Sequence, residues 1–210
     1  MAKSKRPALS AFGINCTLKP SGKASSTQKL LDQLLEAIKQ YDVATSSARM
    51  VDFDIKPGVS ADEGDGDDWP GIRRRILDAR ILVMATPIWM GHPSSLAQRV
   101  QERMDAFLDE IDEEGRYPTF GRVAVVVVVG NEDGAHHVSA ELYQGLADVG
   151  FTIPAGSSAY WVGEAMGETN YKDLKKTPKP LSQAIQTLAC NAIHLARLLD
   201  ASPYPAPQKS

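Results

Sequence analysis

The chain has 210 residues, 43% of them hydrophobic and 23% charged, and a formal net charge of −3. This composition is typical of a globular chain, which can bury a sizeable core without disulfide or metal staples. The balanced charge and the short apolar runs predict neither nucleic acid nor membrane as a partner. No stretch reads as a secretory signal, so we expect a cytoplasmic protein.

We expect one domain over residues 8–200, between a basic, disordered tail at 1–7 and a Pro-rich tail at 201–210. The two cysteines, Cys16 and Cys190, form neither a disulfide framework nor a CxxC or Cys/His metal motif. The expectation is therefore two buried thiols and no metal site.

Five apolar runs predict β-strands. They lie at 8–16, 48–55, 79–85, 122–130 and, more weakly, 151–160. The fourth run contains five consecutive valines, from Val125 to Val129. Side chains that are β-branched and apolar on both faces are typical of a central strand in a parallel sheet that helices cover on each side.

Apolar residues at helical spacing separate these runs. They predict helices that begin near Ser25, Trp69, Leu96, Val138 and Leu181. Alternation of strands and helices favours an α/β fold, a three-layer sandwich with helices on both faces of a parallel sheet.

Two longer connections stand out. The acidic loop 61–71 is expected to be a solvated connection, because it lacks the spacing of an EF-hand calcium site. The irregular stretch 156–180 is expected to be a binding lid or an oligomer contact. In an open parallel sheet, ligands bind beyond the carboxyl ends of the strands, so the loops after the first, third and fourth strands belong together.

The loop after the first strand, residues 15–31, is rich in hydroxyl side chains and carries Lys19 and Lys23. It leads into a helix whose first N–H groups and dipole attract anions, which makes it a candidate phosphate cradle. Simple N-capping by Ser25 or Ser26 explains the hydroxyls equally well. The loop has neither a Walker A nor a GxGxxG pattern, which argues against an NTPase and against a dinucleotide-binding Rossmann site.

The loop after the third strand holds Pro87, Ile88, Trp89, Met90 and Gly91. Apolar side chains at the end of a buried strand could line a flat slot for a heteroaromatic ring, with Gly91 allowing close approach of the backbone. A hydrophobic patch for oligomerisation is the competing interpretation, and the two are compatible.

The loop after the fourth strand offers Asn131 and Glu132 as polar edges and Gly134 as a turn residue. His136 and His137 follow; neighbours on a helix point about 100° apart, so these two cannot bind one metal ion from the same face. One of them could donate a proton near neutral pH, although a surface or capping histidine explains each as well.

These three loops resemble those of the flavodoxin-like NAD(P)H-dependent FMN reductase and quinone reductase superfamily, which includes the tryptophan-repressor-binding-protein-like flavoproteins. The matching motifs are CTLKPSGKASST, ATPIWMGHPSSLAQRVQERMD and VVVGNEDGAHHVSAELYQGLADVGF. The first motif departs from the shorter phosphate loops of the family by extra residues around Lys19 to Lys23. The resemblance implies a five-stranded parallel sheet in the order 2-1-3-4-5, FMN as cofactor and NAD(P)H as co-substrate.

The resemblance also implies which residues hold FMN. The phosphate would be surrounded by Thr17, Lys19, Ser25, Ser26 and Thr27. The isoalloxazine ring would be held by Pro87, Ile88, Trp89, Met90 and Gly91, and flanked by Asn131, Glu132 and Gly134. Our candidates for protonating a reduced acceptor are His136 and His137, because both lie in the third loop.

The expected activity is hydride transfer from NAD(P)H through the flavin to a quinone or a similar small acceptor. The main alternative is a flavodoxin-type electron carrier between protein partners, but such carriers tend to be strongly acidic and this chain is not. A flavin-free interaction protein with the same fold is a third possibility. A homodimer or homotetramer is expected. Neither the physiological acceptor nor the choice between NADH and NADPH follows from the sequence.

Overall fold

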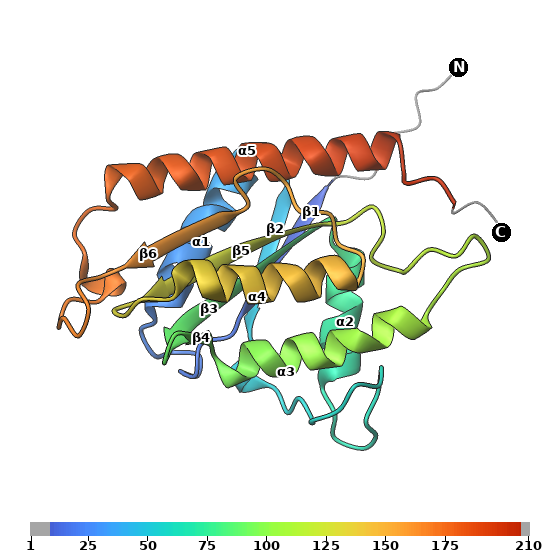
Figure 1. Ribbon diagram of the computed structural model, residues 1–210, viewed down its shortest axis with the longest axis horizontal. Coiled ribbons are helices and arrows are strands. Elements are labelled where there is room, and N and C mark those ends of the chain that lie inside the picture. Colours follow the sequence, from blue (N-terminus) through green and yellow to red (C-terminus); the bar gives the residue numbers. More distant parts are fainter. Residues whose placement is uncertain (1–8, 207–210) are drawn as a thin grey trace.

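A sheet between two layers of helices makes up the computed structural model, which describes residues 9–206 (Figure 1). The strands are β1 (Ser10–Asn15), β2 (Ala44–Arg49), β3 (Ile81–Trp89), β4 (His92–Pro93), β5 (Val123–Gly130) and β6 (Ser158–Val162). The helices are α1 (Ser26–Lys39), α2 (Trp69–Asp78), α3 (Ser95–Met104), α4 (Ala135–Asp148) and α5 (Lys179–Ala201). Within the described residues, no helix combines the length and the apolar character that a bilayer crossing requires.

The strands β2-β1-β3-β5-β6 lie in this order and pair in parallel, while the two-residue β4 pairs antiparallel with β3. With β4 left aside, this is the predicted order 2-1-3-4-5, and β4 is an addition that the prediction lacked. The predicted three-layer α/β sandwich around a five-stranded parallel sheet is confirmed.

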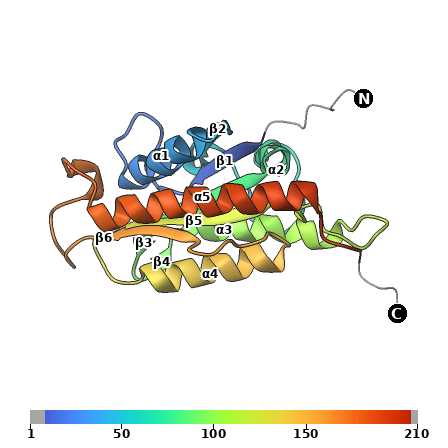
Figure 2. The same cartoon turned by 90° about the horizontal axis from the view of Figure 1, so that it is seen from above.

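The valines of β5 show how both faces of the sheet are covered. Val125 and Val127 belong to the core formed with α1 and α5, whereas Val126 and Val128 belong to the core formed with α2, α3 and α4. Viewed from above, α1 and α4 lie on opposite sides of the sheet (Figure 2). Because side chains alternate between faces along a strand, an uninterrupted run of valines fills two cores at once.

The predicted second strand, 48–55, is misplaced. β2 ends at Arg49, and the chain then forms a short 3₁₀ helix at Met50–Asp52. β2 is an edge strand, and its polar side chains at Ser46 and Ser47 are exposed. An edge strand of this kind lacks an apolar pattern. The prediction was based on the apolar residues after Arg49, which lie beyond the end of the strand.

The predicted fifth strand, 151–160, begins too early. Phe151 is buried, but Thr152 makes only an isolated bridge to Val123, and β6 starts at Ser158. A proline and a glycine interrupt the run between these points, which is why the chain leaves the sheet and returns to it.

The predicted tail at 1–7 lies outside the described residues, as does 207–210 of the predicted C-terminal tail. The described part of that tail, 202–206, follows α5 without regular structure. Of the two thiols, Cys16 is buried and burial raises its pKa, whereas Cys190 is exposed on α5, so the expectation of two buried thiols is wrong for Cys190.

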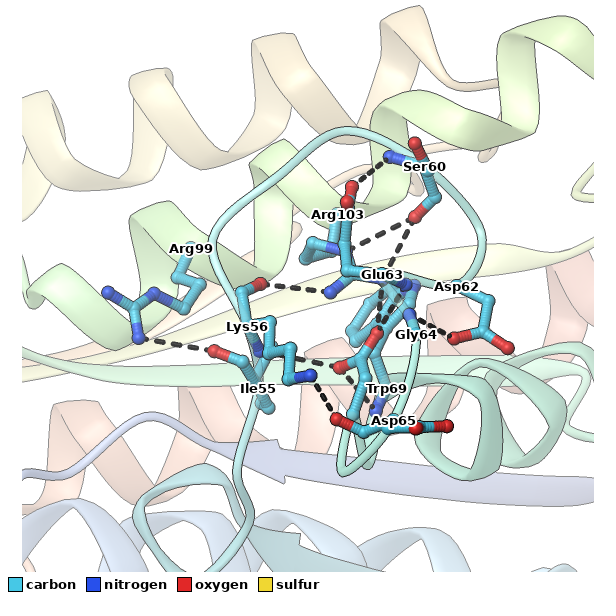
Figure 3. Close-up of polar contacts among 11 residues, drawn as sticks. Ile55, Lys56, Ser60, Asp62, Glu63, Gly64, Asp65, Trp69, Arg99 and Arg103 are labelled. Atoms are coloured by element: carbon cyan, nitrogen blue, oxygen red, sulfur yellow. Dashed lines mark hydrogen bonds and ion pairs between the residues drawn. The ribbon is translucent and has the colours of Figure 1, made fainter.

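Arg103 of α3 anchors the acidic loop that precedes α2 (Figure 3). Its guanidinium donates hydrogen bonds to the carbonyl oxygens of Lys56 and Ser60 at 2.9–3.2 Å and to the carboxylate of Asp67 at 2.7 Å. The side chains of Arg103 and Asp67 are both fully buried. The prediction of a solvated connection at 61–71 is therefore wrong at Asp67.

The environment of Asp67 keeps this carboxyl ionised. Burial raises its pKa, but hydrogen bonds from Arg103 and from three backbone N–H groups outweigh burial and lower the pKa to about 2. A buried cation and a buried anion thus satisfy each other, and the loop carbonyls take the remaining guanidinium donors.

Replacing Asp67 with Asn should destabilise the fold by about 3–5 kcal/mol at neutral pH, because the buried charge of Arg103 loses its partner. The folded-state pKa of Asp67, about 2, lies below the value of an unfolded chain. Its stabilising contribution is therefore complete above the unfolded pKa and is lost as the pH falls toward 2. The difference in unfolding free energy between wild type and D67N should narrow by about 2 kcal/mol between pH 5 and pH 2.

Denaturant unfolding at a series of pH values measures this difference. Asp65→Asn, which alters an exposed carboxylate of the same loop, is the matched control and should change stability by less than about 0.5 kcal/mol. Equal behaviour of the two variants would contradict a stabilising role for the buried pair.

Candidate functional site

A cavity of about 560 Å³ opens at the carboxyl ends of β1, β3, β5 and β6. This end of the sheet lies at the left in Figure 1, far from the last turn of α5. Four segments that are distant in sequence form its walls. The lining residues are Thr17, Leu18, Lys19, Ser25, Ser26, Thr27, Pro87, Ile88, Trp89, Met90, Val129, Gly130, Asn131, Glu132, Met166, Gly167 and Asn170.

The start of α1 forms the polar end of the cavity. Ser25 is the N-cap, and its hydroxyl accepts a hydrogen bond from the N–H of Gln28 at 3.3 Å. Thr17 and Thr27 are buried beside it. The first turn of α1 carries no acidic side chain, so the helix dipole and the remaining N–H groups face no negative charge from their own helix. This end of the cavity suits an anionic group.

Arg49, at the end of β2, holds the loop that precedes α1. Its guanidinium donates to three carbonyl oxygens of the segment 19–23 at 2.7–3.3 Å. Asp52 accepts hydrogen bonds from the hydroxyl and the backbone N–H of Ser21, and these bonds lower the pKa of Asp52. Two side chains that the prediction did not single out therefore fix the extra residues of this loop.

A tight hairpin forms the apolar wall. β3 runs on to Trp89 and turns directly into β4, so the prediction of a loop at 87–91 is wrong for residues 87–89, which belong to the strand. Met90 and Gly91 are the turn residues, with φ of 54° and 78°, and positive φ at both positions is typical of a type I′ turn. For a methionine this conformation costs roughly 1 kcal/mol. The side chain of Met90 is 89% exposed at the mouth of the cavity.

Asn131 and Glu132, which follow β5, connect this wall to its neighbours. A carboxylate oxygen of Glu132 accepts a hydrogen bond from the N–H of Met90 at 2.9 Å. The side-chain amide of Asn131 donates to two carbonyl oxygens of the segment 167–169 at 3.0–3.1 Å. The backbone carbonyl of Asn131 also accepts from the N–H of Met166 at 3.0 Å. Both residues thus position the walls as well as lining the cavity.

The segment after β6 forms the fourth wall, within the stretch that was predicted as a lid or an oligomer contact. Lys29 of α1 donates to three carbonyl oxygens of the segment 171–174 at 2.8–3.3 Å. The hydroxyl of Ser26 accepts from the N–H of Lys172 at 3.2 Å. Met166 is 93% exposed beside the cavity. Only the length of this segment signalled its involvement, and the lining residues within it were missed.

All of the predicted flavin-contacting residues except Gly91 and Gly134 line the cavity. These two glycines pack against each other instead. A Cβ atom at Gly134, whose φ is 123°, would lie 2.8 Å from the carbonyl oxygen of Gly91. They shape the two loops by allowing a close approach of backbones.

Neither His136 nor His137 lines the cavity. Both lie in the first turn of α4, where Nε2 of His136 is 3.0 Å from the hydroxyl of Tyr160 and Nε2 of His137 is 2.7 Å from the carboxylate of Glu141. This placement gives no support to the predicted role of either histidine in protonating an acceptor bound in the cavity.

The sequence model of a known family, described as NADPH-dependent FMN reductase, matches residues 10–167. The chain belongs to this family. Membership of the FMN reductase family confirms the resemblance on which the prediction rested, and with it FMN as the cofactor and an oxidoreductase as the class of protein.

Two curated proteins are similar to this FMN reductase family member. One is the 8-demethyl-8-aminoriboflavin-5′-phosphate synthase of Streptomyces davaonensis, 32% identical over 208 residues, which are 94% of this chain and 80% of the synthase. The other is the divalent metal cation transporter MntH of Mycobacterium bovis, 38% identical over 169 residues. That match covers 79% of this chain but only 25% of the transporter, so the chain spans about a quarter of its length.

A solved structure agrees with the first of these similarities. The crystal structure of RosB with the bound intermediate 8-demethyl-8-formylriboflavin-5′-phosphate superposes with a TM-score of 0.83 and 32% sequence identity. The match covers 94% of this chain and 82% of RosB. A flavin-binding protein therefore shares almost the whole fold.

Replacing Gly134 with Ala should destabilise the protein by about 2–4 kcal/mol, because a methyl group would press on the Gly91 carbonyl as well as strain the backbone. Gly64→Ala is the matched control, since Gly64 has a φ of 88° but open space around its Cβ position. In that control the unfolding free energy should fall by only roughly 1–2 kcal/mol, which is the cost of the backbone strain. Equilibrium unfolding measures both, and an equal loss would show that the contact between the two loops contributes nothing.

Proposed function

We propose that the cavity binds FMN with its phosphate at the start of α1 and its ring against the hairpin of β3 and β4. The observation that carries the proposal is the polarity of the cavity. One end combines a helix N-terminus with buried hydroxyls and Lys19, and the other end is apolar. A flat ring with a phosphorylated tail matches both ends, and the volume lies in the range of small-molecule sites.

The proposed contacts follow from this division. Lys19 and the hydroxyls of Thr17 and Thr27 neutralise and hold the phosphate, together with N–H groups of the first helical turn. Pro87, Ile88, Trp89 and Met90 cover the ring by dispersion, and Asn131 and Glu132 supply polar groups at its edge.

When bound, FMN would supply hydride transfer from NAD(P)H to a quinone or a similar small acceptor. The chain contributes placement more than acid–base chemistry. Trp89, Met90 and Met166 offer exposed apolar surface at the cavity mouth, where a second planar molecule can stack. The proposal assigns no proton transfer to His136 or His137.

The relatives favour a second candidate, in which the flavin is the substrate. The synthase that shares 32% identity over 94% of this chain is named for making a modified riboflavin phosphate, and the RosB structure holds such a compound. In that case the same cavity would hold FMN while its ring substituents change.

The exposed apolar surface at the mouth also supports a second copy of this chain as partner. Leu18, Trp89, Met90 and Met166 are all exposed beside the cavity. We propose that in a homodimer or a homotetramer the partner chain covers part of this surface and leaves room for the co-substrate beside it. Light scattering on the purified protein would detect a mass of two or four chains.

Saturation with FMN at about 100 times its dissociation constant should stabilise the protein by about 2.7 kcal/mol and raise the melting temperature by roughly 5–10 °C. Riboflavin lacks the phosphate and should raise it far less at equal concentration. A thermal-shift titration measures both. Equal shifts for the two flavins would contradict a phosphate site at α1.

The FMN-loaded protein should oxidise NADH or NADPH through many turnovers when benzoquinone is present. Steady-state absorbance measures this turnover, and mass spectrometry of the flavin afterwards provides the control. No turnover with unchanged flavin would favour an electron carrier. A changed mass of the flavin would favour the flavin-modifying candidate.

A further inference from the structure

Three side chains with metal-binding atoms meet outside the cavity, between the hairpin and α4. His92 comes from β4, and His137 and Glu141 come from α4. An oxygen of Glu141 lies 3.0 Å from Nδ1 of His92 and 2.7 Å from Nε2 of His137. All three ligand atoms lie within 4.8 Å of one another, and residues 9–206 contain no other such set of three.

We propose that His92, His137 and Glu141 form a binding site for Zn²⁺. Two imidazoles and one carboxylate are a ligand set that Zn²⁺ uses, with water in the fourth position. Ligand atoms around a tetrahedral zinc ion lie about 3.3 Å apart. The two separations from Glu141, 2.7 and 3.0 Å, lie slightly below this distance, and no two of the three ligand atoms are more than 4.8 Å apart.

The ligands are held in place before any metal arrives. His137 and Glu141 are four residues apart on α4, and their side chains already meet on one face of the helix. His92 pairs with Trp89 in the hairpin, and the hairpin rests on α4 through the contact of Gly91 with Gly134. The site therefore joins two rigid elements and requires no loop to close.

The surroundings leave room for the water ligand. The side chain of His92 is 63% exposed, and that of Glu141 is 33% exposed. Both residues also line a groove between α3 and α4 with a volume of about 720 Å³. A metal ion held here would keep an open coordination position toward solvent.

The ligand chemistry selects the class of metal. Two nitrogen ligands suit Zn²⁺ and its late transition-metal neighbours, whereas Mg²⁺ and Ca²⁺ prefer oxygen ligands. None of the three residues lines the cavity, so metal binding and flavin binding are tested separately.

Isothermal titration of the tag-free, EDTA-treated protein with ZnCl₂ tests the proposal. We expect one site per chain with micromolar or tighter affinity, and no binding heat with MgCl₂. The variants His92→Asn, His137→Asn and Glu141→Gln should each weaken zinc binding by about a hundredfold. His194→Asn is the matched control, because His194 is exposed on α5 and should leave the affinity unchanged.

Thermal unfolding in EDTA shows whether the variants are folded. All four should have melting temperatures close to that of the wild type without metal, so a loss of zinc affinity cannot be attributed to misfolding. Co²⁺ provides a second readout, since a tetrahedral site with nitrogen and oxygen ligands gives visible absorption that the three ligand variants should lose. Absence of zinc binding in the wild type, or equal binding in the double variant H92N/H137N, would overturn the proposal.

Discussion

The parallel pairing of β1, β3, β5 and β6 is the constraint on which the candidate site depends. Parallel strands end at the same edge of a sheet, so the connections that follow them begin side by side. The register places Asn15 opposite Ala85, and Val129 opposite Pro87. Segments more than a hundred residues apart thus become adjacent walls, and an antiparallel arrangement of the same strands would have sent half of them to the other end.

Long cationic side chains then fix these irregular walls by binding backbone carbonyls. At the cavity, Arg49 donates to three carbonyl oxygens of the loop before α1, and Lys29 donates to three of the segment after β6. Arg103 binds the loop before α2 in the same way, although that loop does not line the cavity. Carbonyls outside regular structure need such partners when water is excluded. Arg49 and Lys29 therefore hold the walls, and Lys19 is the basic residue that lines the cavity.

The sequence predicted those features that depend on local pattern. The valine strand, the N-cap at Ser25 and the start of α2 at Trp69 follow from periodicity and capping, and the cavity walls follow from the parallel order. The position of the edge strand β2 was predicted wrongly because its side chains are polar and give no apolar pattern.

Contacts between residues that are distant in sequence were not predicted, for a different reason. Asp67 was predicted to be solvated because no residue near it in sequence indicates its partner Arg103. An arginine among the buried residues of α3 could have indicated that a buried carboxylate was needed. His137 was judged against its neighbour His136, whereas its partners are Glu141, one turn away, and His92, on another element. Contacts of this kind depend on packing that a linear pattern does not contain.

The turn at Met90 and Gly91 shows what the site demands of the fold. Stability alone favours an Asn-Gly pair in such a turn, because methionine is strained at positive φ. The strain persists because the Glu132 carboxylate binds the Met90 N–H, Gly134 packs under Gly91, and His92 pairs with Trp89. These restraints hold the exposed side chain of Met90 at the cavity mouth and the side chain of His92 against Glu141 of α4. One two-residue turn therefore connects the apolar wall of the cavity with the cluster of His92, His137 and Glu141.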